Sequence, residues 1–160
     1  MKKIRPLIFI GLIVCLSFSD KKINLVGLWQ DSPEVAAGWT NIFQIFPDGN
    51  FKFTYNSMVC DKRNISYSGK WKKDSSGNLV LMIWQKEILE GGKLIPSDAF
   101  SSCASDSTID GGVNKTINLE KPEKKVLKLS GYRTDPDHYD IETMKIDNVR
   151  YWKIRQDPKD

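Results

Sequence analysis

Apolar and polar side chains alternate with a period of two along residues 65–72, and no stretch of the chain sustains a helical period. Residues 41–56 add two apolar-rich runs that are joined at Pro47-Asp48-Gly49-Asn50. Proline presets the backbone φ angle, aspartate caps the turn and glycine tolerates a positive φ, so this segment is predicted to be a β-hairpin. Repeated alternation with turns of this kind predicts an all-β fold.

Further strands are expected at regular intervals along the chain. They cover residues 25–30, 79–84, 116–119, 126–132 and 149–156, which brings the total to about eight strands at spacings typical of barrels or sandwiches. The charged residues 120–124 are expected to form a turn, and residues 91–112 a long loop. Closure hides strand edges best, so we expect an antiparallel up-and-down β-barrel, with a β-sandwich as the alternative.

The first 19 residues have the pattern of a secretory signal peptide. A positively charged start precedes a short apolar run at residues 7–16, and the small residues Ser17 and Ser19 stand where a signal peptidase reads the chain. We expect cleavage between Ser19 and Asp20, which leaves residues 20–160 as a single domain. Such a protein is exported, to the periplasm or to the extracellular space.

A lipid anchor is the alternative fate of the N-terminus. Leu12-Ile13-Val14-Cys15 resembles a bacterial lipobox, in which the cysteine is lipidated and becomes the mature N-terminus. Val14 is larger than the residue that such a motif usually has before its cysteine. Contact with a membrane is therefore expected only if Cys15 carries lipid.

The net charge of the chain argues against nucleic acid as a partner. The full sequence has 24 basic and 20 acidic residues, but Lys2, Lys3 and Arg5 are lost with the signal peptide. The mature chain is therefore close to neutral, and it has no basic stripe with interleaved aromatic residues. The pair Lys124-Lys125 is expected to lie in a solvated turn.

Two cysteines remain in the mature chain, Cys60 and Cys103. In an oxidising compartment an even pair of cysteines predicts a disulfide bond. Closing a loop of roughly 43 residues would contribute on the order of 4 kcal/mol to stability in the chain-entropy model.

No residue pattern indicates an enzyme. The single histidine, His138, lies among Asp135, Asp137 and Asp140, a combination that can bind a divalent cation. We expect this acidic, proline-bearing loop to be solvated and to hold no metal. Motifs for a nucleophile, a phosphate loop or a dinucleotide site are missing from the sequence. The chain is therefore predicted to be a protein without catalytic activity and without a cofactor.

Gly27-Leu28-Trp29 resembles the G-x-W motif at the first strand of lipocalins and the wider calycin group. The order of aromatic strands and glycine-containing turns over residues 25–156 is similar to that of short bacterial lipocalin-like domains. In that family the glycine permits a close approach of the chain, the tryptophan closes one end of the barrel, and a basic residue of the last strand lies across it. The resemblance implies these roles for Gly27, for Trp29 and for Arg150 or Arg155.

The same resemblance implies carriage of a small hydrophobic or amphipathic molecule, such as a lipid. Aromatic side chains at alternate strand positions can line such a pocket, although they can equally fill a core. The residues expected to contact a ligand in the barrel interior are Phe51, Phe53, Tyr55, Tyr67 and Trp71. The alternative is an envelope interaction or inhibitor module with a filled barrel, which would meet another protein through loops 91–112 and 133–142.

Overall fold

The computed structural model describes residues 23–98 and 102–159, so the predicted signal peptide and Cys15 lie outside the described residues. The strands in chain order are β1 Gly27–Gln30, β2 Ile42–Ile45, β3 Asn50–Thr54, β4 Asn64–Lys73, β5 Leu79–Pro96, β6 Ser107–Leu127, β7 Leu129–Asp135, β8 Ile141–Ile146 and β9 Val149–Arg155. Two short 3-10 helices complete the set, η1 Ala37–Trp39 and η2 Pro136–His138.

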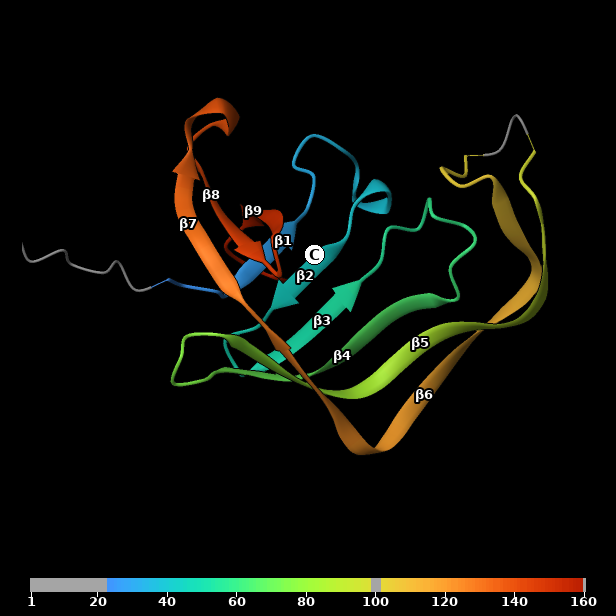
Figure 1. Cartoon of the computed structure of the whole chain (residues 1–160), viewed down its shortest axis with the longest axis horizontal. Coiled ribbons are helices and arrows are strands. Elements are labelled where there is room, and N and C mark those ends of the chain that lie inside the picture. Colours follow the sequence, from blue (N-terminus) through green and yellow to red (C-terminus); the bar gives the residue numbers. More distant parts are fainter. Residues whose placement is uncertain (1–22, 99–101, 160) are drawn as a thin grey trace, which may run out of the picture.

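All nine strands belong to one antiparallel sheet in the order β6-β5-β4-β3-β2-β1-β9-β8-β7. The predicted all-β fold is confirmed, but the sheet is not closed into a barrel, because its outer strands β6 and β7 do not pair with each other in the described part of the chain. Only Lys128 lies between these two strands, so the chain runs from β6 directly into β7 (Figure 1). One residue cannot reverse the chain, which prevents β6 and β7 from forming a hairpin.

The predicted hairpin of residues 41–56 is confirmed as β2 and β3. Phe43 pairs with Phe53 across the two strands. In the turn, the Asp48 side chain accepts a hydrogen bond from the backbone N–H of Asn50 at 3.0 Å, and Gly49 has a φ of +80°. The turn residues therefore do what their chemistry predicts.

The predicted long loop at residues 91–112 is wrong over most of its length. β5 continues to Pro96 and β6 begins at Ser107, with Leu94 paired to Ile109. We call residues 85–96 and 107–118 of this hairpin the arm. Gly91 and Gly92 have φ values of +71° and +70°, so these glycines bend the arm without ending its ladder.

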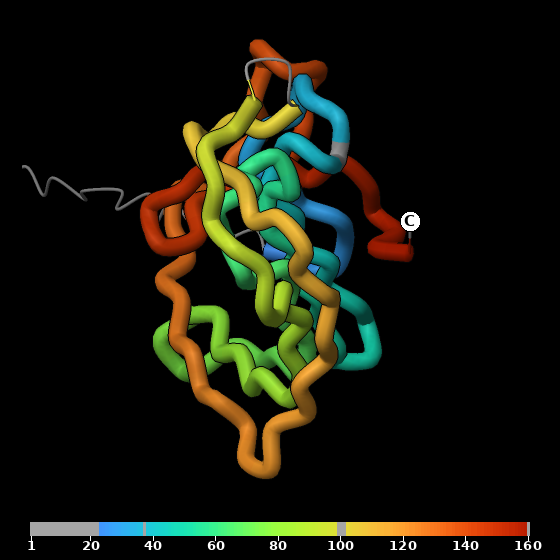
Figure 2. The backbone as a smooth tube through the Cα atoms, turned by 90° about the vertical axis from the view of Figure 1, so that its right-hand side faces the viewer, coloured from blue at the N-terminus to red at the C-terminus, as the bar shows by residue number. Residues whose placement is uncertain are grey.

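The charged segment expected to be a turn is instead a bulge in β6. Gln85 pairs with Asn118 and Ile83 pairs with Glu123, which leaves residues 119–122 opposite Trp84 alone. The bulge projects at the lower end of the molecule, in orange in Figure 2. The acidic loop expected at 133–142 is also shorter, because β7 extends to Asp135 and β8, which the sequence did not indicate, begins at Ile141.

A single hydrophobic core fills the concave side of the sheet. Its buried members are Leu25, Trp29, Phe43, Ile45, Phe51, Phe53, Tyr67, Leu79, Leu81, Ile83, Leu127, Met144, Ile146 and Tyr151. Both outer strands contribute side chains to this core or to its border. Leu127 of β6 is buried in the core, and Leu129 and Tyr132 of β7 pack against it. Side chains from the two edges of the sheet therefore meet in one core although the backbones of those edges do not pair.

Four tyrosines in and around this core are expected to make the protein less stable at alkaline pH. Burial is the first cause that raises the pKa of Tyr55, Tyr67 and Tyr151 above the ordinary value, and burial together with Glu142 raises that of Tyr132 to about 12. The unfolded chain loses these protons from about pH 10, before the folded chain does, so stability is fully present below pH 10 and falls as the pH rises further.

We therefore expect the denaturant midpoint to fall steadily from pH 10 to pH 12, with the tyrosinate absorbance of these four residues appearing together with the loss of folded signal. Tyrosines that all ionise near pH 10 in a protein that stays folded would contradict this assignment.

Candidate functional site

The aromatic residues predicted to line a ligand cavity are divided between core and rim. Phe51, Phe53 and Tyr67 are buried, and the ring of Phe53 lies 4.5 Å from that of Phe43 and 4.8 Å from that of Tyr67. These rings fill the interior against one another. Space for a ligand must therefore be sought around them and not between them.

Tyr55 and Trp71 lie at opposite ends of this aromatic cluster. Trp71 is beside the β2–β3 turn, where its backbone N–H bonds to Gly49 and its indole Nε1 donates to the Phe46 carbonyl at 3.0 Å. Tyr55 follows β3 at the other end, with its ring 4.9 Å from Phe53. The structure thus does not bring Trp71 and Tyr55 into one site.

Two adjoining pockets meet at Tyr55. The first, which we call the rim pocket, has a volume of about 190 Å³ and is lined by Tyr55, Asn64, Ser66, Tyr67, Ile83, Lys86, Glu123 and Lys125. The second, which we call the arm pocket, has a volume of about 370 Å³ and is lined by Thr54, Tyr55, Asn56, Ser57, Val59, Cys60, Lys62, Asn64, Ile65, Leu89, Thr108, Ile109 and Asn114. Tyr55 and Asn64 belong to both linings, so the two pockets adjoin at these residues.

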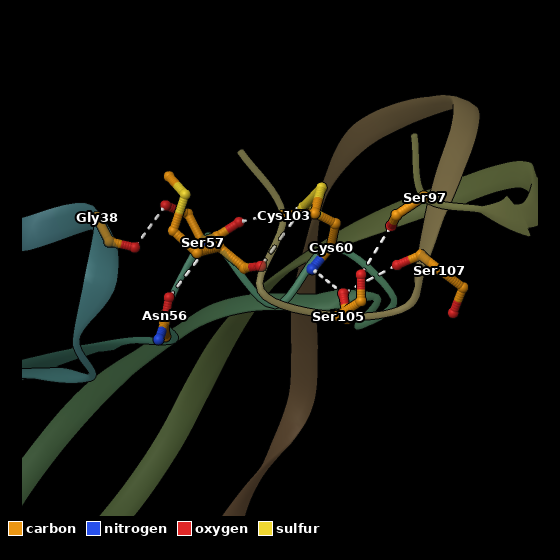
Figure 3. The surroundings of a disulfide bond; sticks show 9 residues. Gly38, Asn56, Ser57, Cys60, Ser97, Cys103, Ser105 and Ser107 are labelled. Atoms are coloured by element: carbon orange, nitrogen blue, oxygen red, sulfur yellow. Dashed lines mark hydrogen bonds between the residues drawn. A yellow bond between two sulfur atoms is a disulfide. The ribbon is translucent and has the colours of Figure 1, made fainter. Parts of the chain in front are cut away.

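The predicted Cys60–Cys103 disulfide is confirmed, and it holds the wall of the arm pocket. It joins the loop after β3 to the segment at the tip of the arm (Figure 3). Around it, the Cys60 N–H donates to Ser105 Oγ at 3.0 Å, and the Ile109 N–H donates to the Cys60 carbonyl at 3.2 Å. The arm is therefore fixed over the loop, and a disulfide of this kind is compatible with an oxidising, exported environment.

The polar groups of the rim pocket include two cations and one carboxylate. Lys86 Nζ lies 2.5 Å from Glu123 Oε2. Lys125 Nζ lies 5.8 Å from the centre of the Tyr67 ring, at a distance suited to a cation–π contact. The sequence reading missed Lys125, which was expected in a solvated turn.

The position of Lys125 could have been found by extending the alternation backward from Leu127. Lys125 pairs with Leu81 and Leu127 pairs with Leu79, and both leucines of β5 are fully buried. Residues two apart on a strand face the same side, so Lys125 lies on the concave side and Lys124 on the convex side.

The predicted G-x-W residues, Gly27 and Trp29, lie on β1, between β2 and β9 in the sheet. A Cβ atom on Gly27 would lie 2.6 Å from the Arg155 carbonyl oxygen, so this glycine permits the close approach of β1 and β9. Trp29 is fully buried and its Nε1 donates to the Leu25 carbonyl at 2.8 Å. The basic residue found across its ring is Lys153, with Nζ 5.1 Å from the ring centre.

Arg150, one of the two arginines considered for that position, lies instead over Trp152 at 6.0 Å. Arg150 and Lys153 are three residues apart on β9, so their side chains leave opposite faces of the strand. The side chain that faces inward with Tyr151 is Lys153, and both residues are buried.

His138 joins two loops that are far apart in sequence. Its Nδ1 lies 3.1 Å from Asp135 Oδ2 and its Nε2 lies 3.1 Å from Glu34 Oε1. Hydrogen bonds, first from Trp152 Nε1 and then from His138, lower the pKa of Asp135. Among residues 23–98 and 102–159, no group of three or more His, Cys, Asp or Glu side chains is placed to hold a metal ion.

Comparison with protein families, with characterised proteins and with solved structures finds no match to this chain. The resemblance to lipocalins therefore stays a prediction from the sequence. In the two described ranges, no helix is both long enough and apolar enough to span a membrane.

Proposed function

We propose that this chain is an exported binding protein for a small amphipathic molecule, held in the rim and arm pockets at one end of a lipocalin-like curled sheet. The observation that carries the proposal is a pair of pockets with Tyr55 and Asn64 in both linings, a polar one beside the aromatic core and a larger, more apolar one beside the arm. The volume of about 370 Å³ of the arm pocket lies within the range typical of small-molecule sites.

The site proposed here differs from a ligand buried at the centre of a barrel. Phe51 and Phe53 fill the core against Tyr67 and Tyr55 and line neither pocket, whereas Tyr55 and Tyr67 line the rim pocket. Cys60 of the disulfide is part of the arm-pocket lining, so the covalent link holds this wall in place before a ligand binds.

The test is a fluorescence titration of oxidised residues 20–160 with N-phenyl-1-naphthylamine, a neutral apolar probe. We expect saturable binding at one site. The Tyr55→Ala variant should bind about tenfold more weakly, a change of about 1.4 kcal/mol, because it removes the wall common to both pockets. The matched control is Trp84→Ala, which removes an aromatic side chain that is 44% exposed and outside both pockets.

A protein that does not enhance probe fluorescence would contradict the proposal and favour the filled interaction module. An equal loss of binding in the Tyr55 and Trp84 variants would place the probe elsewhere and would equally overturn it.

A further inference from the structure

The rim pocket has a cation without a carboxylate partner. Lys125 makes no ion pair with any residue of the described chain, and its ammonium group is placed over the Tyr67 ring. The one carboxylate of this pocket, Glu123, is already bound by Lys86 at 2.5 Å. The three charged side chains of the rim pocket therefore leave one positive charge uncompensated.

Two hydroxyl donors accompany this charge. The rings of Tyr55 and Tyr67 lie 6.0 Å apart, and neither hydroxyl has a hydrogen-bond acceptor within the described residues. Burial raises the pKa of both phenols, so both keep their protons at neutral pH and can donate. Neither hydroxyl is among the buried polar atoms that lack a partner, so each opens onto the pocket and can exchange water for an acceptor supplied by a ligand.

The adjoining surface of the arm pocket is suited to an apolar group. Val59, Ile65, Leu89 and Ile109 contribute aliphatic side chains to its wall. A molecule that extends from the rim pocket into the arm pocket would therefore pass from hydrogen-bond donors and a positive charge to hydrocarbon.

We propose that the ligand is an organic anion, such as a carboxylate or sulfonate, whose charged group binds Lys125 and the hydroxyls of Tyr55 and Tyr67 while its apolar part lies in the arm pocket. This inference rests on the proposed function and names the class of molecule bound at the same site. Charge-assisted hydrogen bonds to a carboxylate or sulfonate are stronger than those to a neutral acceptor, so the pocket distinguishes anions from neutral analogues.

The test compares two probes of similar shape. 1-Anilinonaphthalene-8-sulfonate carries the anionic group that N-phenyl-1-naphthylamine lacks, and each is titrated against the oxidised wild-type chain, Lys125→Met and Lys124→Met. Lys124 is the matched control because it is the neighbouring lysine of β6 but pairs with Met82 on the convex face. Lys125 is exposed, so replacing it is not expected to prevent folding.

We expect Lys125→Met to weaken binding of the anionic probe about tenfold or more, while binding of the neutral probe changes less than about twofold. Lys124→Met should leave both affinities unchanged, and Lys125→Arg should restore binding of the anion. If the neutral probe binds and the affinity for the anionic probe is the same in the wild-type chain and in Lys125→Met, the anion inference alone is overturned. Failure of the wild-type chain to bind either probe would overturn the proposed function together with it.

Discussion

The Phe53→Ala variant is expected to unfold with a free energy lower than that of the wild-type chain by about 3–5 kcal/mol. Phe53 is 6% exposed, and its ring contacts those of Phe43, Tyr55 and Tyr67 at centre distances of 4.5, 4.9 and 4.8 Å. The substitution removes the ring that contacts the three others. Because β3 is hydrogen-bonded to a strand on each side, its backbone can move little to fill the cavity.

Equilibrium denaturation with urea, followed by tryptophan fluorescence, measures this change. The control is Tyr139→Ala in the loop after η2, because that side chain is 97% exposed and its removal should change stability by less than about 0.5 kcal/mol. A loss below about 1 kcal/mol for Phe53→Ala would mean that the interior is hollow around this ring, contrary to the packing described here.

The Lys153→Met variant is expected to lose about 3 kcal/mol of stability. The Lys153 side chain is 1% exposed, and its Nζ lies 3.0 Å from Glu142 Oε2 and donates to the Asn24 carbonyl at 2.9 Å. Methionine keeps the shape of the side chain over Trp29 but removes the ammonium group that lies 3.0 Å from the Glu142 carboxylate. The cost comes from that remaining charge more than from the lost pair.

A second substitution separates these two causes. In Lys153→Met combined with Glu142→Gln, the negative charge that faced Lys153 is also gone, so at least about 1 kcal/mol of the loss should be recovered relative to Lys153→Met alone. Chemical denaturation of both single variants and the double variant completes the cycle. Additive losses in the double variant would show that the two side chains do not interact and would contradict the buried pair.

The local features of the fold were predictable because they depend on neighbouring residues. The β2–β3 hairpin follows from Asp48 and Gly49, and the inward positions of Phe51 and Phe53 follow from alternation. The pairing of Cys60 with Cys103 followed from a count, since these are the two cysteines outside the predicted signal peptide. Each of these inferences needed only a short range of sequence or a count.

The features that were missed depend on how the sheet ends. Gly91, Gly92 and Gly111 suggested a loop. The two strands nevertheless continue beyond these glycines, where Leu94 pairs with Ile109, because the glycines bend the hairpin without ending its strand pairing. The prediction of a closed barrel was also wrong. The sequence shows that the strand segments on either side of Lys128 follow each other directly, but it does not show that they lie at opposite edges of the sheet.

The candidate site was only partly accessible from sequence. Tyr55 and Tyr67 were selected for their alternation and do meet at the rim, whereas Trp71 lies at the other end of the cluster. Lys125 was overlooked because two adjacent lysines suggest a solvated turn, and its inward position depends on the register with Leu81. Bonds between distant loops, such as that of His138 with Glu34, leave no periodic pattern in the sequence.

A small amphipathic molecule bound at the rim of the curled sheet, where the two pockets adjoin, should perturb the residues that line them. The most direct test of this binding is a titration of ¹⁵N-labelled, oxidised residues 20–160 with N-phenyl-1-naphthylamine, followed by amide chemical shifts. We expect the largest shifts at Tyr55, Asn64 and Tyr67, which line the rim pocket. Shifts that gather around Trp84 on the exposed face, or a spectrum that the probe leaves unchanged, would contradict this expectation.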